Sequence, residues 1–355
     1  MDGSSRISIA DLADGAAHVP LLDEAGRIAK PLLVINLDSP AKPAVLERAA
    51  VRARDCDRLL VGVVCGPLPA RVRPLLDALD LTLVAAAEES RCVTVPVPDD
   101  EAEVLSQAAA RNRQAAVVLG RVLRTTETLP VPAGLEVESF AYSTLLSGQE
   151  FRHWLRSREA QRLPLPAEMP VVTRRDGARL LITLNRPERR NAYGRQLRDA
   201  LTDALRVALL DPAITRVVLD GAGPVFCSGG DLAEFGTAPD LATAHFIRTR
   251  AGAARLIHDL GTRIEARVHG PCVGAGIELP AFAGTVVADE GATFRLPEID
   301  MGLIPGAGGT VSIPRRIGRW RTLYLALTGR PLPAATALVW GLVDSVAPPA
   351  FIRHG

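Results

Sequence analysis

Three glycine-rich turns constrain the second half of this chain more than any other feature of its sequence. They read FCSGGDL (226–232), GPCVGAGIEL (270–279) and IPGAGGT (304–310), and each stands at a junction between a strand pattern and a helix pattern. Residues without side chains let backbone N–H groups approach another group closely. Because two acids, Glu278 and Glu298, accompany these turns, we expect a site that moves a proton beside exposed backbone donors.

The segments between these turns alternate between strand and helix. Apolar runs predict strands at 180–184, 216–220 and 264–268. Leucines at helical spacing predict an amphipathic helix over 193–210, and a mixed helix is expected across 240–260. This succession indicates an α/β architecture with layered crossovers.

The first part of the chain shows a similar but weaker pattern. Its segment LLVINLDSP (32–40) is similar to LLITLNRPE (180–188), and each is followed by a helical stretch and an apolar strand. Two interpretations stay open, a degenerate internal repeat and two ordinary βαβ starts. Helices are also expected over 104–124 and 143–158. Since this part has no glycine-rich loop near an acid, we interpret it as non-catalytic.

Three prolines between residues 162 and 170 resist both helix and sheet, and they predict a domain boundary. We therefore expect an N-terminal α/β extension over 1–165 and a second, catalytic domain over 170–355.

Composition narrows the possible partners. The 355 residues include 41 basic and 40 acidic side chains, a net charge of +1, which argues against nucleic-acid and membrane partners. The five cysteines form no C-x-x-C pair, and the histidines form no metal-binding cluster. The first residues lack a secretory pattern, and no apolar run approaches the roughly 20 residues that cross a bilayer. We expect a soluble cytoplasmic protein without a metal.

Taken together, several segments of the second part resemble the enoyl-CoA hydratase/isomerase family, the crotonase superfamily. Order and spacing agree across about residues 170–347. The resembling segments are LNRPERRNA (184–192), VFCSGGDLAEF (225–235), VHGPCVGAGIEL (268–279), FRLPEIDMGLIPGAGGT (294–310) and LTGRPLPAATALVWGLVDSV (327–346). The resemblance implies a crotonase-like spiral of ββα units. It also implies an acyl-CoA thioester substrate and no cofactor beyond the CoA of that substrate.

The resemblance also implies a role for particular residues. The backbone N–H groups of Gly230 and Ala275 would form an oxyanion hole for the thioester carbonyl. Glu298 would deliver a proton to Cα, while Glu278 would orient and deprotonate water, which the backbone of Gly306 would also contact. Because both glutamates are present, hydration is favoured over isomerisation. The plainer interpretations are a helix-surface charge for Glu278 and a helix cap for Glu298.

Evidence for substrate-binding residues is weaker. Arginine suits phosphate groups, although a solvated arginine is the plainer interpretation. The residues that the resemblance places along the CoA path are Arg189, Arg190, Ser228, Gly229, Asp231 and Leu232. Cys227 and Cys272 flank two of the turns without a histidine that would activate them, so we interpret them as packing residues.

Three features depart from the family pattern. Pro280 should kink the helix that carries Glu278, and Ala275 replaces a glycine that many relatives have. After GLVDSV the chain ends at Gly355, whereas relatives normally continue with helices that cover the acyl pocket and help to build trimers. The N-terminal part could supply that cover, and by resemblance we expect a homo-oligomer, a trimer or hexamer. An isomerase, a dehydratase and a non-catalytic acyl-CoA-binding protein stay open as alternatives.

Overall fold

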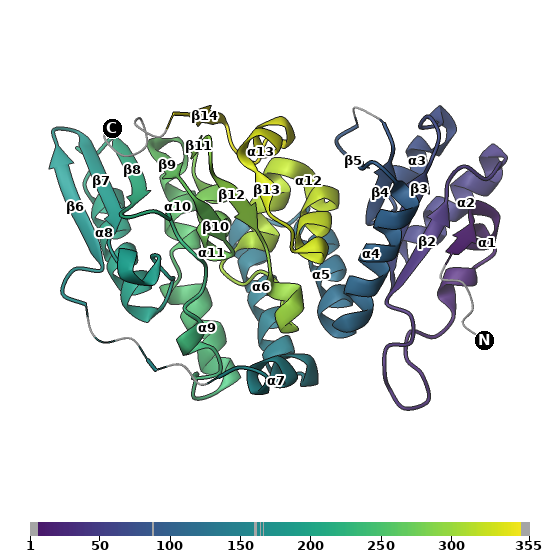
Figure 1. The fold of residues 1–355 in the computed structure, drawn as a ribbon, viewed down its shortest axis with the longest axis horizontal. Helices are drawn as coiled ribbons and strands as arrows, with labels where there is room; N and C mark the ends of the chain where they lie inside the picture. The colour runs from purple at the N-terminus through teal and green to yellow at the C-terminus, as the bar shows by residue number, and fades with distance from the viewer. Residues whose placement is uncertain (1–5, 87–88, 160–161, 164, 166, 349–355) are drawn as a thin grey trace.

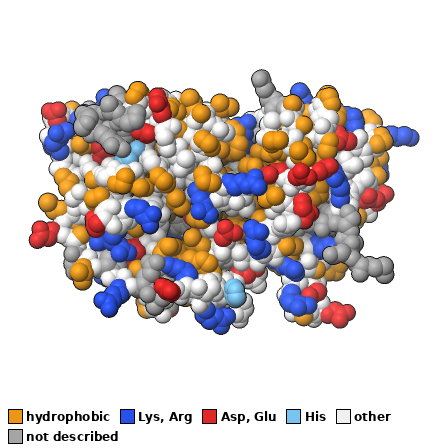
Figure 2. Space-filling model, in the orientation of Figure 1, with side chains coloured by type: hydrophobic (Ala, Val, Ile, Leu, Met, Phe, Trp, Pro, Cys, Tyr) orange, Lys and Arg blue, Asp and Glu red, His pale blue; other side chains and the backbone are white. Residues whose placement is uncertain are grey.

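A computed structural model describes residues 6–86, 89–159, 162–163, 165 and 167–348 of the chain. It has the expected α/β architecture, built around two mainly parallel sheets and a smaller third one. Figure 1 shows one large sheet at each end of the molecule, with helices between them. Figure 2 shows arginine and acidic side chains interspersed over one face, in keeping with the balanced charge.

The N-terminal sheet contains five parallel strands in sequential order. They are β1 (Arg6–Ser8), β2 (Leu32–Asn36), β3 (Leu59–Val64), β4 (Leu81–Val84) and β5 (Val93–Thr94). Alternate residues of β2 enter two different apolar cores: Leu32 and Val34 face one, and Leu33 and Ile35 the other. Since both faces are covered, β2 and β3 appear in the sequence as continuous apolar runs.

Helices cover both faces of this sheet. One core includes residues of α1 (Ile9–Ala13), α2 (Pro43–Arg54) and α3 (Arg73–Leu76). The other includes residues of α4 (Pro98–Arg111) and α5 (Arg113–Thr126).

The second large sheet has six strands, of which only the β6–β7 pair is antiparallel. In spatial order they are β14 (Ser345–Ala347), β11 (Thr285–Asp289), β9 (Ile264–Val268), β8 (Arg216–Gly221), β7 (Arg179–Leu184) and β6 (Val171–Asp176). A small sheet joins β10 (Pro271–Val273), β12 (Thr293–Arg295) and β13 (Leu332–Pro333). The three predicted strands of this part are confirmed as β7, β8 and β9.

The helices of the second part are α8 (Arg195–Leu210), α9 (Leu241–Ala251), α10 (Ala254–Leu260), α11 (Ala275–Glu278), α12 (Gly309–Thr328) and α13 (Ala334–Trp340). The helix predicted over 193–210 is confirmed as α8. The single helix predicted over 240–260 is wrong, because the backbone is extended at Gly252 and separates α9 from α10. No helix of the described chain combines the length and the apolar character that a membrane crossing requires.

Two helix predictions for the first part also need correction. The helix expected over 104–124 is divided between α4 and α5, because Asn112 leaves the helical region. The helix expected over 143–158 is divided between the end of α6 (Val131–Leu146) and α7 (Gln149–Arg156). There the backbone is extended at Gly148, which caps α7. No helix or strand occurs among the described residues between α7 and β6.

The two parts of the chain share one apolar core. It includes Val61 of the first sheet, Leu119 of α5 and Ala266 of the second sheet. Helix α6, which belongs to the N-terminal part, packs against both α9 and α12 (Figure 1). Removal of the N-terminal part would therefore expose apolar surface of the second part.

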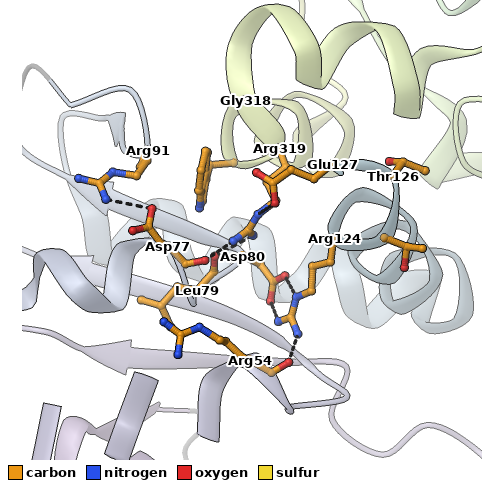
Figure 3. Close-up of polar contacts among 12 residues, drawn as sticks. Arg54, Asp77, Leu79, Asp80, Arg91, Arg124, Thr126, Glu127, Gly318 and Arg319 are labelled. Atoms are coloured by element: carbon orange, nitrogen blue, oxygen red, sulfur yellow. Dashed lines mark hydrogen bonds and ion pairs between the residues drawn. The ribbon is translucent and has the colours of Figure 1, made fainter. Parts of the chain in front are cut away.

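Arginines make the polar joint between α12 and the first sheet (Figure 3). Arg319 of α12 donates to the carbonyl oxygens of Asp77 and of Leu79, the latter at 2.9 Å, and pairs with Glu127. Nearby, both oxygens of the buried Asp80 accept from Arg124 at 2.6 Å. Because carbonyls and carboxylates surround these guanidinium groups, the joint is buried without an unpaired charge.

Removing the partner of Asp80 tests the buried ion pair beside this joint, which lies within the N-terminal part. We expect Arg124→Met to lower the free energy of unfolding by about 3–5 kcal/mol, because it leaves a buried carboxylate without its cation. Arg121→Met on the same helix is the matched control, since Arg121 pairs with Asp57 at the exposed surface and such pairs contribute about 0–1 kcal/mol. Urea unfolding measures both. Equal losses in the two variants would contradict the assignment.

Candidate active site

A cavity of about 430 Å³ lies where the two parts of the chain meet. Residues of α6, α7 and α9 line one side of it, and residues from all three glycine-rich turns line the other. The predicted site residues that line it are Gly230, Asp231, Ala275, Glu278, Glu298 and Gly306.

Close backbone contact brings the first two turns together. The N–H of Val273 donates to the carbonyl oxygen of Cys227 at 3.2 Å. A Cβ on Gly276 would lie only 2.1 Å from that oxygen, so only glycine permits this approach. As a result Gly230 and Ala275, which belong to different turns, line the same cavity. Neither of their N–H groups donates a backbone hydrogen bond within the described chain.

Glu278 is buried, which excludes its interpretation as a helix-surface charge. Its Oε2 accepts from the N–H groups of Ala307 and Gly309, at 2.7 and 2.9 Å. Helix α11 ends at Glu278, and the chain continues as a 3₁₀ helix from Pro280 to Phe282, so the helix stops before Pro280 where a kink was predicted. The proline ends the helix after the glutamate, and the carboxylate still lines the cavity.

Glu298 approaches the same place from another element. It begins the 3₁₀ helix Glu298–Met301, but its side chain lines the cavity. A Cβ on Gly274 would lie 2.5 Å from Oε1 of Glu298 and 3.5 Å from Oε1 of Glu278. The two carboxyl groups therefore converge beside Gly274, and a side chain at this position would collide with Glu298. Oε2 of Glu298 is buried and has no hydrogen-bond partner in the described chain.

Burial changes the protonation of both acids. Loss of hydration raises the pKa of Glu278 well above its usual value of 4.5, and the neighbouring Glu298 and Glu138 raise it further. Burial likewise raises the pKa of Glu298 to about 8. Two such neighbours share a proton, because like charges in a poorly hydrated site repel. Glu278 accepts two N–H bonds that favour a carboxylate, so we assign the shared proton to Glu298.

A third acid, Glu138, comes from the N-terminal part and was not among the predicted site residues. It lies on α6, is buried, and lines the cavity. Its Oε1 accepts from the N–H of Gly308 at 2.7 Å, and its Oε2 accepts from the N–H and hydroxyl of Thr310 at 2.9 and 2.7 Å. A sequence signal existed, because Glu138 shares the buried face of α6 with Val131, Gly134 and Leu145. Acids are rarely buried in this way without a partner.

Tyr142, also on α6, was missed as well. Its ring packs on Gly306, where a Cβ would lie 2.3 Å from Cε2 of the tyrosine. The glycine predicted to contact water is therefore also the glycine that admits an aromatic ring from the other part of the chain. Its contact with water stays a prediction.

The structure does not bring the remaining predicted residues into the cavity wall. Arg189 makes a bidentate ion pair with the buried Asp231, with its shortest contact at 2.7 Å. The N–H of Ser228 donates to the carbonyl oxygen of Arg190. Gly229 is packed against Val273, and Leu232 is exposed. Their contacts with CoA stay predictions.

Two cysteines flank the turns and are buried. Burial raises the pKa of Cys227 to about 12, and that of Cys272 well above its usual value. Such thiols are poor nucleophiles, in agreement with a packing role. Among the described residues, no group of three or more histidine, cysteine, aspartate or glutamate side chains is arranged to hold a metal ion.

Two convergent acids in a cavity that Gly230 and Ala275 also line are an arrangement suited to acid–base chemistry. Comparisons with known proteins agree with this class. The sequence profile of the enoyl-CoA hydratase/isomerase family matches residues 175–354. The chain is 36% identical over 178 residues to the 2,3-dehydroadipyl-CoA hydratase of Escherichia coli, covering 50% of this chain and 69% of that protein.

Other relatives carry different names. Identity to the 1,2-epoxyphenylacetyl-CoA isomerase of Escherichia coli is 36% over 172 residues, or 47% of this chain and 65% of that one. A solved carnitinyl-CoA dehydratase from Mycobacterium avium is 38% identical, with a TM-score of 0.46 over 52% of this chain and 72% of that one. The chain belongs to the enoyl-CoA hydratase/isomerase family of enzymes, which confirms the resemblance and the crotonase-like fold of its second part.

The protonation of Glu298 can be measured directly. Because its pKa is raised, Glu298 should stay protonated above pH 4.5 and ionise as the pH rises through about 8. Infrared difference spectra should show a protonated-carboxyl band that disappears in this range and is absent from Glu298→Gln. Glu138→Gln should remove a separate step at about pH 7 and should also lower the pKa of Glu298, because Glu138 raises it. Titration of the Glu298 band near pH 4.5 would contradict the assignment.

Proposed function

We propose that the protein is an enoyl-CoA hydratase, which adds water across the α,β double bond of an enoyl-CoA thioester, or removes it in the reverse direction. One observation carries this proposal. Two convergent carboxyl groups, Glu278 and Glu298, line the same cavity as Gly230 and Ala275, whose N–H groups have no backbone partner in the described chain. A hydratase needs both sets of groups at one carbonyl compound.

In this proposal the thioester oxygen accepts hydrogen bonds from the N–H groups of Gly230 and Ala275. When water attacks Cβ, negative charge develops on that oxygen, and the two donors stabilise the enolate. A single donor of this kind typically contributes about 3–4 kcal/mol to lowering the barrier. Neither donor has to give up a backbone bond within the described chain to do so.

The two acids divide the proton transfers. Glu278, whose Oε2 is fixed by two N–H groups, removes a proton from water with its Oε1 as the oxygen bonds to Cβ. Glu298, which carries the shared proton, delivers it to Cα and becomes a carboxylate. The proton that Glu278 took from water then passes to Glu298, which restores the starting state of both acids. Each transfer stays inside a cavity where burial holds both pKa values high.

An isomerase is the second candidate. One carboxylate that moves a proton between carbon atoms is enough for isomerisation, and either glutamate could do this alone. The 36% identity to an isomerase supports keeping this candidate. A protein that binds acyl-CoA without turnover is a third possible outcome of the experiment.

A panel of short, long and aromatic enoyl-CoA thioesters with mass-spectrometric detection separates these functions. We expect a product heavier by one water, whereas an isomerase leaves the mass unchanged. Because each acid acts in proton transfer, Glu278→Gln and Glu298→Gln should each lower kcat by about 10²–10⁴-fold. Glu290→Gln, at an exposed position between β11 and β12, is the matched control. Binding without turnover, or unaltered rates in both variants, would refute the proposal.

A further inference from the structure

Arg248 is a cation at the cavity wall whose charge the proposed chemistry does not use. It lies on α9 and lines the cavity. Its Nε donates to Oγ of Ser139 at 3.1 Å, and its Nη2 donates to the carbonyl oxygen of Ser139 and to Oγ of Ser143. Its guanidinium group lies 4.8 Å from the centre of the Tyr142 ring. Helix α6 of the N-terminal part thus fixes this side chain.

No carboxylate of the described chain is within ion-pair distance of Arg248. Two other arginines do have a carboxylate partner. Arg250 on the same helix pairs with Glu136 at 3.0 Å, and Arg198 in the same cavity pairs with Asp199 at 2.7 Å. The nearby Glu138 attracts Arg248 without forming an ion pair with it, and its oxygens accept from Gly308 and Thr310. Burial lowers the pKa of Arg248, as expected for a cation that lacks a direct counter-ion.

One nitrogen of Arg248 remains available. Nη1 donates to no described residue, and it is not among the enclosed polar atoms that lack a partner. Since the residue lines the cavity and Nη1 is its nitrogen without a partner, we infer that Nη1 and its two donors face the cavity. Apolar side chains also line the cavity, among them Leu135, Leu146 and Ile247. A cationic donor beside such side chains suits the charged end of an apolar ligand.

Tyr142 connects the acid pair to Arg248 along the cavity wall. Its ring contacts Gly306, close to the acid pair, and Arg248 at the ring face. The cation and the turn beside the acids therefore both contact one aromatic ring. An acyl chain of a few carbon atoms that starts between the acids can extend along Tyr142 toward the guanidinium group.

We propose that Arg248 binds a carboxylate at the far end of a short acyl chain, so that the preferred substrate is an enoyl-CoA thioester of a dicarboxylic acid. This inference rests on the proposed hydratase function, and it assigns that function a substrate class. Nη1 donates to the distal carboxylate, while Tyr142 and the neighbouring leucines contact the methylene groups between the two ends.

The test compares two substrates of equal carbon number, a trans-2-enoyl-CoA that ends in a methyl group and one that ends in a carboxylate. The native enzyme should show a higher kcat/KM for the carboxylated substrate. A charged hydrogen bond is worth about 1.5–3 kcal/mol, so Arg248→Met should lower the ratio of the two kcat/KM values by about 10- to 100-fold, chiefly through KM. Arg248→Lys keeps the charge and should retain part of the ratio.

Arg250→Met is the matched control, since Arg250 lies on the same helix and is paired outside this cavity. A second measurement needs no variant: the saturated ω-carboxyacyl-CoA should inhibit the native enzyme more strongly than the saturated acyl-CoA of equal length. Because Arg248 also bonds to α6, this measurement keeps the inference testable if Arg248→Met fails to fold.

The outcomes separate the two proposals. Without hydration of any substrate, the proposed function fails, and stronger inhibitor binding by the carboxylated compound would still support the anion site. Hydration with equal kcat/KM for both substrates, or a ratio that Arg248→Met leaves unchanged, overturns the inference and leaves the hydratase intact. An equal loss for both substrates would mean that Arg248 contacts the CoA phosphates or only supports the fold, which also overturns it.

Discussion

The start of α12 holds together both the fold and the site. The N–H groups of residues 307–310, at and just before its first turn, bind two buried carboxylates, Glu278 from the second part of the chain and Glu138 from the first. The positive end of a helix stabilises anions, and its first N–H groups have no partner within the helix. The same turn binds Glu278 and, from α6, Glu138. The position of the pair Glu278 and Glu298 therefore depends on the packing of α6 against this turn. Farther along α12, Arg319 attaches the same helix to the first sheet.

This arrangement brings three acidic side chains together in a poorly hydrated environment. Burial raises the pKa of Glu278, Glu298 and Glu138, and repulsion from neighbouring acids raises the pKa of Glu278 and Glu298 further. The helix terminus favours ionisation of the two acids that it binds, whereas Glu298 has no such donor for Oε2. The site can therefore hold a proton donor and a carboxylate side by side near neutral pH. Arg248 lies over the ring of Tyr142, and α6 fixes it there.

Much of the second part could be predicted from its sequence. Buried strands are short apolar runs, α8 shows a clear leucine periodicity, and the glycines needed for close backbone contact are visible as clusters. The helix breaks at Asn112, Gly148 and Gly252 were missed, because their neighbours keep a helical pattern across each break. The contribution of α6 could not be predicted. Glu138 and Tyr142 meet the turn at 306–310 only through long-range packing, which local patterns do not encode.

The central claim is that residues of both parts surround a single CoA thioester. The most direct measurement is a crystal structure of the protein with a saturated acyl-CoA bound. We predict that the thioester oxygen lies within hydrogen-bond distance of the N–H groups of Gly230 and Ala275. The acyl chain should lie between the acid pair and the Tyr142 ring. A thioester bound elsewhere, or an acyl chain that makes no contact with α6, would contradict the account.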